Sequence, residues 1–359
     1  MKWYIETDRY AKIYTKNAGS KAPADIAEIY RKSGMKALIF PLFPKEAKSE
    51  VYKKIWLLTK GTFPWIKVFC KVRKGDVIFF KHPFYGFRLT YLWISFIRKW
   101  KGCRFIVLIH DINSLRKGGN NYTKEINSTG RFADNQLLKQ FDAVICHNDR
   151  MKEYLVSLGH RADKIICLEI FDYLTEVNVS DRSLSGVPSI AIAGNLGEKK
   201  SGYIYKLDFP KDILTVHLYG RGFEASEASA NLVYHGSFEP EELPQYLTGD
   251  FGLVWDGISI ETCAGNTGQY LRYNNSHKLS LYLASNMPVI VWDEAAMAEF
   301  VLSKNLGFTV KSLAEIPERI NALSPSQYQE MCEAARKEGE KLRNGYYTKK
   351  AIEQALQVI

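Results

Sequence analysis

A dense group of polar side chains stands where a helix is expected to begin, directly before the apolar run 279–283. The group consists of Asn274, Asn275, Ser276, His277 and Lys278. A helix start needs one capping side chain, which Asn275 or Ser276 can provide. The amides of the first turn, the helix dipole and the Lys278 ammonium then converge on one point, which favours an anion and above all a diphosphate. The alternative is a solvent-exposed cap with more polar groups than it needs.

Two glycine-containing turns follow other predicted strands and could serve the same anion. The first, AGNLGEKKSGYI at 193–204, combines Asn195 and two turn-forming glycines with Lys199 or Lys200 as a partner for phosphate. The second, LYGRGFE at 218–224, places Arg221 between two glycines, where its guanidinium could clamp a diphosphate. The first has neither the glycine spacing of a P-loop nor that of a dinucleotide-binding turn, and each is also compatible with an ordinary glycine turn.

Short apolar runs alternate with amphipathic ones along the chain, which is typical of α/β domains with parallel sheets. In the first half we predict strands at 3–7, 36–40, 76–80, 104–110, 142–147 and 164–170, and helices at 23–33, 46–58, 86–100, 131–140 and 149–158. In the second half we predict strands at 189–194, 214–220, 232–236, 250–255, 288–292 and 307–310, and a helical end at 325–357. The polar stretch 171–188 predicts a linker. Doubly wound domains bind ligands at the carboxyl ends of strands, where all three motifs stand.

The composition sets bounds on the class of protein. A chain of 359 residues, 46% of them hydrophobic, is long enough for two domains with sizeable cores. The six cysteines are scattered without a CxxC pair, so we expect buried thiols in a reducing compartment. The first residues lack the apolar segment of a signal peptide, and no apolar run approaches the roughly 18 residues of a membrane-spanning helix. These features predict a cytoplasmic protein.

The net charge of +10 is concentrated in the first half, where residues 45–104 carry 15 basic and 3 acidic residues among many aromatic ones. This region fits a solvated basic face over an aromatic core, a surface for anionic lipid headgroups, or a nucleic-acid surface. No nucleic-acid-binding motif is present, and we predict no nucleic-acid partner. Within 84–104 we expect Leu92 and Phe96 to pack on the sheet, and Tyr91, Trp93 and Trp100 to face outward toward a membrane.

The segments DFGLVWDG (250–257) and YLRYNNSHKLSLYLASNMPVIVW (270–292) resemble the donor-binding half of bacterial galactofuranosyltransferases and related sugar transferases of the GT-B fold. The segments KNAGSKAPADIAEIYRKSGMK (16–36), IHDINSLR (109–116) and AGNLGEKK (193–200) resemble other parts of the same group. The resemblance implies two Rossmann-like, doubly wound α/β domains that face a cleft. Their expected bounds are 1–170 for the acceptor domain, 171–188 for the linker, 189–341 for the nucleotide-sugar domain and 342–359 for a C-terminal helix that crosses back.

The resemblance also implies roles for single residues. Nucleotide and diphosphate contacts are expected from Asn195, Lys200, Tyr219, Arg221, Asn274, Asn275, Ser276 and Lys278, with Tyr219 stacked on uracil. Sugar or acceptor contacts are expected from Asn17, Gly19, His82, Asp256 and Glu261. The sequence has no Asp-x-Asp motif, so we expect no metal and no cofactor, and cationic side chains and helix amides to balance the diphosphate.

The E-x₇-E pattern of retaining GT-B enzymes is missing as a whole, which favours an inverting reaction. Inverting transfer needs a base for the acceptor hydroxyl and cations for the departing diphosphate. Asp111 directly follows the predicted strand 104–110 and is the predicted base. His110 and His82 are the alternatives.

Three functions fit these features. The first is transfer of galactofuranose from a UDP-sugar to a glycan or lipid-linked glycan in surface polysaccharide assembly, which also accounts for the basic aromatic region. The second is transfer of glucose or N-acetylglucosamine to a protein-bound glycan, and the third is non-catalytic nucleotide binding. Further partners expected for the first function are an anionic membrane on the inner face of the plasma membrane and other copies of the chain.

Overall fold

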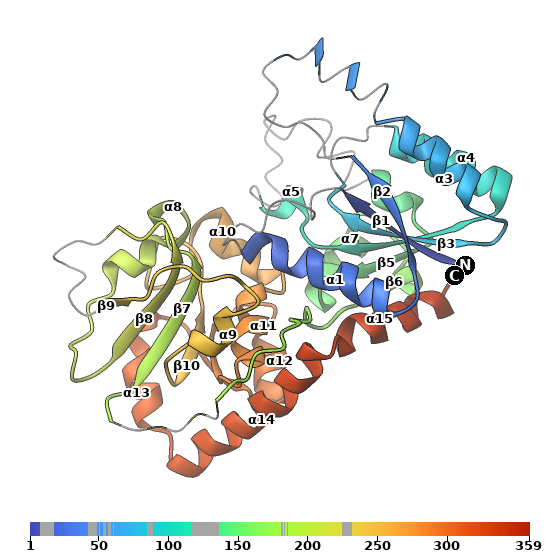
Figure 1. Ribbon diagram of the computed structural model, residues 1–359. Helices are drawn as coiled ribbons and strands as arrows, with labels where there is room; N and C mark the ends of the chain where they lie inside the picture. Colours follow the sequence, from blue (N-terminus) through green and yellow to red (C-terminus); the bar gives the residue numbers. More distant parts are fainter. Residues whose placement is uncertain are drawn as a thin grey trace.

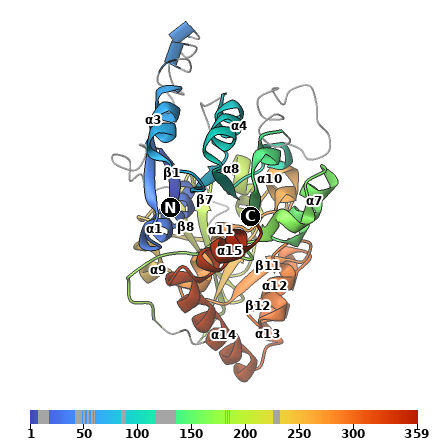
Figure 2. The same ribbon diagram turned by 90° about the vertical axis from the view of Figure 1, so that its right-hand side faces the viewer.

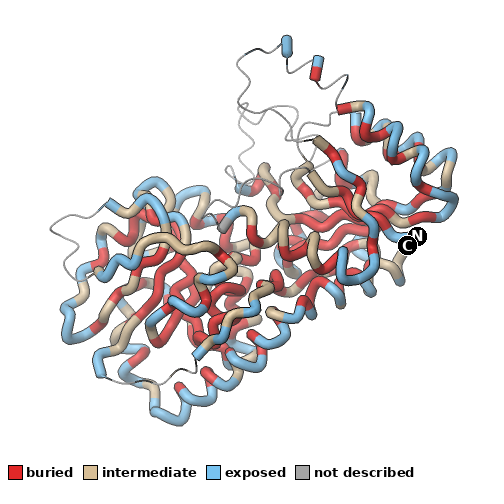
Figure 3. The backbone as a smooth tube through the Cα atoms, viewed as in Figure 1, coloured by how far each residue is buried: buried red, intermediate tan, exposed pale blue. Residues whose placement is uncertain are grey.

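The computed structural model describes residues 1–7, 18–41, 49, 51–52, 55–56, 59, 61–84, 89–116, 136–180, 182, 184, 186–224 and 232–359. These residues form two α/β domains, each built on a six-stranded parallel sheet (Figure 1). The strands of both sheets are the most deeply buried parts of the chain, and the outer faces of the helices are exposed (Figure 3). The predicted two-domain α/β architecture is confirmed.

The first sheet has the strand order β2-β1-β3-β4-β5-β6. Its strands are β1 (Lys2–Thr7), β2 (Lys36–Phe40), β3 (Val77–His82), β4 (Arg104–Ile109), β5 (Ala143–Cys146) and β6 (Ile165–Cys167). The second sheet has the order β12-β11-β10-β7-β8-β9, in which the chain reverses direction across the sheet between β7 and β10. Its strands are β7 (Ser189–Asn195), β8 (Thr215–Arg221), β9 (Leu232–Tyr234), β10 (Phe251–Val254), β11 (Val289–Trp292) and β12 (Gly307–Val310). Every strand in this set overlaps a predicted apolar run.

Each face of the first sheet has its own core, because successive side chains of a strand point to opposite faces. Ile78 and Phe80 of β3 belong to the core under α3 (Phe63–Lys71), α4 (Thr90–Lys101) and α7 (Asp149–Ser157). Phe79 belongs to the other core, under α1 (Lys21–Lys32) and α15 (Tyr346–Gln357). Helix α3 was not predicted. The predicted helices at 46–58 and 131–140 lie largely outside the described residues, and the end of the second forms the 3-10 turn η3 (Leu138–Gln140).

The second sheet is covered in the same way. Its two faces carry α11 (His277–Ala284), α12 (Ala298–Ser303) and α14 (Pro325–Arg343) on one side, and η5 (Gly202–Lys206) and α13 (Ile316–Asn321) on the other. The remaining short elements are η1 (Ala18–Ser20), α5 (Asn113–Arg116), η4 (Ala162–Lys164), α8 (Glu198–Ser201), α9 (Leu243–Tyr246), α10 (Gly265–Gln269), η7 (Tyr270–Arg272) and η8 (Leu313–Glu315). Among the helices that the structure describes, none is long and apolar enough to cross a membrane.

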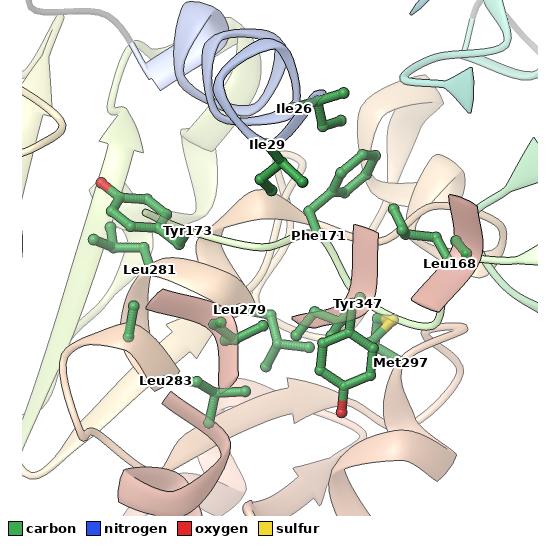
Figure 4. Close-up of a cluster of buried hydrophobic side chains, with 14 of the residues drawn as sticks. Ile26, Ile29, Leu168, Phe171, Tyr173, Leu279, Leu281, Leu283, Met297 and Tyr347 are labelled. Atoms are coloured by element: carbon green, nitrogen blue, oxygen red, sulfur yellow. The ribbon is translucent and has the colours of Figure 1, made fainter. Parts of the chain in front are cut away.

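The first residues of the predicted linker are buried between the two domains. Phe171, Asp172 and Tyr173 are buried, and one hydrophobic cluster runs from α1 past them to α11 and α15 (Figure 4). The Asp172 carboxylate accepts hydrogen bonds from the amides of Tyr347 (3.1 Å) and Thr348 (2.6 Å) in the first turn of α15. Segment 171–188 is polar on average, but its first residues include the buried Phe171 and Tyr173, which join the two cores.

The C-terminal helical region divides into two helices rather than one. The helical conformation is interrupted at Asn344 and Gly345, and Gly345 adopts a left-handed conformation (φ 71°) that favours glycine. Helix α14 packs on α11, whereas α15 returns to the first domain and packs against β5, β6 and α1 (Figures 1 and 2). The expected crossing of the C-terminal helix is confirmed.

Candidate active site

The three sequence motifs of the second domain meet where β7, β8 and β10 end. Since the chain reverses between β7 and β10, the turns after these strands diverge and leave a place for a ligand. The turns are tied together by hydrogen bonds from the Leu196 amide to the Arg221 carbonyl (2.8 Å) and from the Gly257 amide to the Lys200 carbonyl (2.9 Å). A Cβ atom at Gly220 would lie 1.8 Å from the Gly194 carbonyl oxygen, so the close approach of β7 and β8 requires glycine there.

The Lys278 ammonium is the centre of this site. It lies in the first turn of α11 and donates hydrogen bonds to the Trp255 carbonyl (2.8 Å) and to the Asp256 carboxylate (2.9 Å). Burial lowers its pKa, the Asp256 charge opposes that shift, and the nearby Lys200 charge adds to it. The half-buried Lys200 thus stands close to the largely desolvated Lys278 ammonium, and an anion there would be attracted by both.

The start of α11 supports anion binding. Ser276 is the N-cap residue in extended conformation, but its side chain makes no capping hydrogen bond. Ser276 is buried, at 8% exposure, which argues against the alternative of a solvent-exposed cap. His277 is also withdrawn from solvent, stacked on the Tyr173 ring at a centroid distance of 5.1 Å, and burial lowers its pKa to about 4.

Asn275 has a different role from the predicted nucleotide contact. Its amide nitrogen donates to the His147 carbonyl (2.8 Å) and the Glu169 carbonyl (2.9 Å), and its amide oxygen accepts from Asn148 (2.7 Å). Its backbone amide donates to Nδ1 of His147 (2.9 Å). All hydrogen-bonding groups except its carbonyl thus connect α11 to the first domain, and none is left for a phosphate. Asn274 is different, because its side-chain oxygen is buried without a hydrogen-bond partner among the described residues.

Tyr219 also differs from its predicted role as a stacking partner for uracil. Its ring is already stacked on His235, at a centroid distance of 4.6 Å and an interplanar angle of 4°. Its hydroxyl lies 2.6 Å from the Thr248 hydroxyl and accepts the Thr248 amide (2.9 Å). The ring is 1% exposed, so it is part of the core and has no face for a nucleobase.

The remaining predicted residues of the second domain lie around the strand ends. Asn195 is exposed, and its side-chain oxygen accepts the Gly197 amide (3.0 Å), which shapes the turn after β7. Arg221 is exposed at the end of β8, and Glu261 is exposed in the loop after β10. In the first domain, Gly19 lies exposed in η1, and Asn17 lies outside the described residues.

The predicted base Asp111 lies opposite this cluster, at the end of β4. Its carboxylate accepts from Arg116 (3.0 Å) and from the hydroxyl of Tyr270, which belongs to the second domain. Burial raises the pKa of Asp111, while the charges of Arg116 and Lys200 oppose the rise. Since Lys200 lies on α8 of the second domain, the two domains bring Asp111 and the lysine cluster to the same boundary.

The two histidines beside Asp111 are less accessible. His110 is stacked on Phe171, at a centroid distance of 5.7 Å, and its Nε2 has no hydrogen-bond partner among the described residues. Burial holds the pKa of His110 well below its usual range, so the ring is neutral at pH 7. His82 is 2% exposed at the end of β3, and its carbonyl accepts the His110 amide (2.8 Å).

Two residues at this boundary, Lys81 and Tyr270, were missed by the sequence analysis. Lys81 forms an ion pair with Glu6 (2.9 Å) at the edge of the first sheet, and Tyr270 reaches Asp111 from the second domain. Lys81 stands one residue before His82 at a predicted strand end, and this position was the available signal. Tyr270 gave none, because its partner lies in a distant part of the chain. Within the described residues no group of three or more His, Cys, Asp or Glu side chains could hold a metal ion.

A surface cavity of about 300 Å³ lies elsewhere, between the interdomain connection and α14. It is lined by Arg182, Asn286, Gln329, Cys332, Glu333 and Arg336. Arg182 donates to the carbonyl of Leu247 (2.9 Å), which precedes β10, so this cavity belongs to the amino-terminal side of the second sheet. It is separate from the strand ends that carry the lysine cluster.

Two family models cover nearly all of the chain. The model described as Glucosyltransferase 3-like, N-terminal domain, matches residues 8–170, and the corresponding C-terminal domain model matches residues 190–355. The chain is 34% identical over 296 residues to the beta-1,6-galactofuranosyltransferase WbbI of Escherichia coli (strain K12), covering 80% of this chain and 81% of the relative. It is 27% identical over 336 residues to Glucosyltransferase 3 of Streptococcus gordonii, covering 92% of each chain.

Solved structures share the fold at low sequence identity. A sucrose-phosphate synthase from Thermosynechococcus elongatus superimposes with a TM-score of 0.61 at 12% identity, covering 99% of this chain and 96% of the other. The apo form of the lipopolysaccharide outer core galactosyltransferase WaaB superimposes with a TM-score of 0.59 at 12% identity, covering 99% of both chains. The fold is therefore GT-B. Together with the family models and the 34% identity, this places the chain in the glucosyltransferase 3-like family of GT-B hexosyltransferases.

Proposed function

We propose that this protein transfers galactofuranose from UDP-galactofuranose to a glycan acceptor in the assembly of a surface polysaccharide. The observation that carries the donor assignment is the pair of lysines, Lys200 and Lys278, at the ends of β7 and β10. The 34% identity to a galactofuranosyltransferase supports the choice of sugar. Family membership sets aside the alternative of a non-catalytic nucleotide-binding protein.

In this proposal the diphosphate lies between the two lysines and the first turn of α11. Asp256 holds the Lys278 ammonium in place, and exposed Arg221 at the end of β8 is available to a phosphate from the other side. The positive charge of both lysines stabilises the charge that develops on the leaving UDP, so the site needs no metal ion. In this proposal Asn274 accepts a hydrogen bond from the nucleotide, which its unpaired side-chain oxygen among the described residues supports.

The reaction proposed is a single in-line displacement with inversion. The acceptor oxygen forms a bond to the anomeric carbon while the bond from that carbon to the β-phosphate oxygen breaks, and UDP leaves with the bonding electrons. Asp111 takes the acceptor proton as general base, because the Nε2 atom of His110 is buried and its ring is stacked on Phe171. Sugar and acceptor contacts remain assigned to Asn17, Gly19, His82, Asp256 and Glu261.

Glucose or N-acetylglucosamine transfer to a protein-bound glycan is the second candidate. It is supported by the description of both family models and by the name of the Streptococcus gordonii relative. A furanose and a pyranose ring carry the same hydroxyl count and diphosphate, so pocket shape must discriminate between them. The decisive experiment is donor hydrolysis and transfer across UDP-galactofuranose, UDP-galactopyranose, UDP-glucose and UDP-N-acetylglucosamine. A preference for UDP-glucose of tenfold or more in kcat/KM would overturn the galactofuranose assignment.

A lipid-linked acceptor, met at an anionic membrane surface, is the second part of the proposal, and it rests on the face formed by α3 and α4. The buried stripe of α4 is Thr90, Ile94 and Ile97. Leu92 (49% exposed), Phe96 (42%) and Trp100 (66%) follow one another at helical spacing on the outer side. The expected packing of Leu92 and Phe96 on the sheet is therefore wrong, as is the outward position of Trp93, whose ring stacks on Trp65.

The charge of this face complements anionic headgroups. The described residues 61–84 and 89–104 carry nine basic residues and a single acidic one, Asp76, which is buried and paired with the N-terminal ammonium (2.6 Å). Three of the nine pair with carboxylates outside these ranges: Lys81 with Glu6, and Arg98 and Arg104 with Asp142. Exposed lysines 67, 71 and 74 lie on or directly after α3, and Phe69 joins that helix to Phe96 of α4 at a centroid distance of 5.2 Å. Exposed aromatic and aliphatic side chains among lysines favour a headgroup interface.

Co-sedimentation with vesicles tests the membrane surface. We expect binding to phosphatidylglycerol vesicles at low salt, release at high salt, and weaker binding for Trp100→Ser. Leu302→Ser on α12 is the matched control, because it removes a 54% exposed apolar side chain from a helix of the other domain. A protein that stays in the supernatant at low salt would contradict the membrane surface but not the transferase. Self-association in sedimentation velocity that Trp100→Ser abolishes would assign the face to a second copy of the chain.

A further inference from the structure

Tyr270 crosses from the second domain into the core of the first. It belongs to η7, but its ring is buried in the hydrophobic cluster under α7, which is built from residues of the first domain. Its hydroxyl accepts the backbone amide of Ile112 (3.0 Å) and donates to the carboxylate of Asp111. A side chain from the donor-binding domain therefore completes the surroundings of the proposed base.

The segment that carries Tyr270 also carries further contacts between the strand ends of the two domains. Asn148 of the first domain donates to the Tyr273 carbonyl (3.0 Å), and the Asn275 amide group is bonded to His147 and Glu169 as described above. Three residues after Asn275 comes Lys278 of the lysine cluster. Residues 270–278 thus form one continuous connection, with Asp111 at one end and the diphosphate site at the other.

We propose that Tyr270 is a positioning residue: it orients the Asp111 carboxylate for proton transfer, and does so only while segment 270–278 is docked on the first domain. This inference rests on the proposed function, in which Asp111 is the base. The Ile112 amide donates into the Tyr270 oxygen and so strengthens the bond that the hydroxyl donates to Asp111. With Arg116 on Oδ2, the carboxylate is held by two groups and keeps lone pairs for the acceptor proton.

The titration of Asp111 offers a readout that a purely structural role would not change. Burial raises the pKa of this carboxyl, and four neighbours on four different elements lower it. These are Arg116 on α5, Tyr270 on η7, Lys200 on α8 and His82 on β3. Removal of the Tyr270 hydroxyl deletes one lowering contribution and leaves the others, so the pKa of Asp111 rises further. The acidic limb of the pH–rate profile must then move to higher pH.

The experiment compares Tyr270→Phe with Tyr282→Phe. Tyr282 is a buried tyrosine whose hydroxyl accepts the Ala193 amide (2.8 Å) inside the second domain, so it matches the loss of a hydroxyl without touching a base. For Tyr270→Phe we expect kcat to fall roughly tenfold and the acidic limb of kcat/KM to rise by about one pH unit, since a hydrogen bond to a charged group has this order of strength. Tyr282→Phe should keep the wild-type pH profile.

Two further measurements separate this inference from the proposed function. UDP affinity of Tyr270→Phe, measured by calorimetry, should stay within threefold of the wild type, because the lysine cluster is intact. If Asp111→Asn abolishes transfer but Tyr270→Phe leaves both kcat and the pH profile unchanged, the positioning role is wrong and the base assignment stands. If Asp111→Asn transfers hexose at the wild-type rate, both are wrong, while UDP binding still reports on the donor site.

Discussion

Replacement of Lys278 tests the donor site most directly, and its effect can be worked out from the contacts of the ammonium. Two of its three N–H groups donate to the Trp255 carbonyl and the Asp256 carboxylate, which leaves one for a phosphate oxygen. A hydrogen bond between charged groups contributes about 1.5–3 kcal/mol. Loss of this bond should therefore raise the Kd for UDP by roughly 10- to 150-fold.

The same replacement also leaves the Asp256 carboxylate without its ion-pair partner. The Lys278 and Asp256 side chains are each 11% exposed, and removal of one partner from a buried ion pair costs about 3–5 kcal/mol of folding stability. The unpaired carboxylate would also repel a phosphate. We therefore expect Lys278→Met to be destabilised, and the double variant Lys278→Met/Asp256→Asn to recover most of the stability, because neither charge is then left alone.

The assay is titration of UDP into each variant by calorimetry, with thermal unfolding as a check on folding. UDP itself is used because Asp256 is assigned to the sugar, so its loss should not weaken a ligand without a sugar. The double variant, folded and free of the repelling carboxylate, should still bind UDP at least tenfold more weakly than the wild type. A Kd within threefold of the wild type in that variant would refute the placement of the diphosphate at Lys278.

Three further predictions concern metal, the domain boundary and pH. Chelation with EDTA should leave transfer essentially unchanged, since the lysines carry the charge balance; strict dependence on Mg²⁺ or Mn²⁺ would contradict this. Asn275→Ala should lower the free energy of unfolding by about 2–4 kcal/mol, because it removes one buried and two partly buried hydrogen bonds between the domains, and urea unfolding measures the loss. Burial lowers the pKa of His147 to about 4, so the folded state binds fewer protons than the unfolded state between pH 6.5 and 4, and stability is lost as pH falls through that range. His147→Gln should remove about 3 kcal/mol of this dependence, and an unchanged slope would show that His147 titrates normally.

The elements that carry the site were largely predictable because their signals are local. Apolar runs of strand length mark β7, β8 and β10, and the glycines and lysines that follow them stand at strand ends whichever way the sheet is ordered. The placement of Asp111 after β4 and of Lys200 after β7 follows from parallel strands, because their carboxyl ends share an edge within each sheet. The meeting of these two edges at one boundary is decided by the packing of the two domains. The helix α3 was missed, and 171–188 was described only as a polar linker, although Phe171 and Tyr173 are buried.

The division of labour among neighbouring residues could not be predicted, because it depends on partners far away in the chain. In the sequence, Asn275 and Lys278 are equally suited to bind a phosphate. In the structure, Asn275 donates a hydrogen bond to His147, 128 residues earlier, and its polar groups connect the two domains. The ring of Tyr219 is stacked on His235, which directly follows the neighbouring strand β9, so that ring face is not exposed. The hydroxyl of Tyr270 bonds to Asp111 and Ile112 of the other domain. A side chain's direction within a loop or helix start is set by which surface packs against it. Periodicity and composition carry that information for strands and helices, but contacts between domains arise only when the two folded sheets meet.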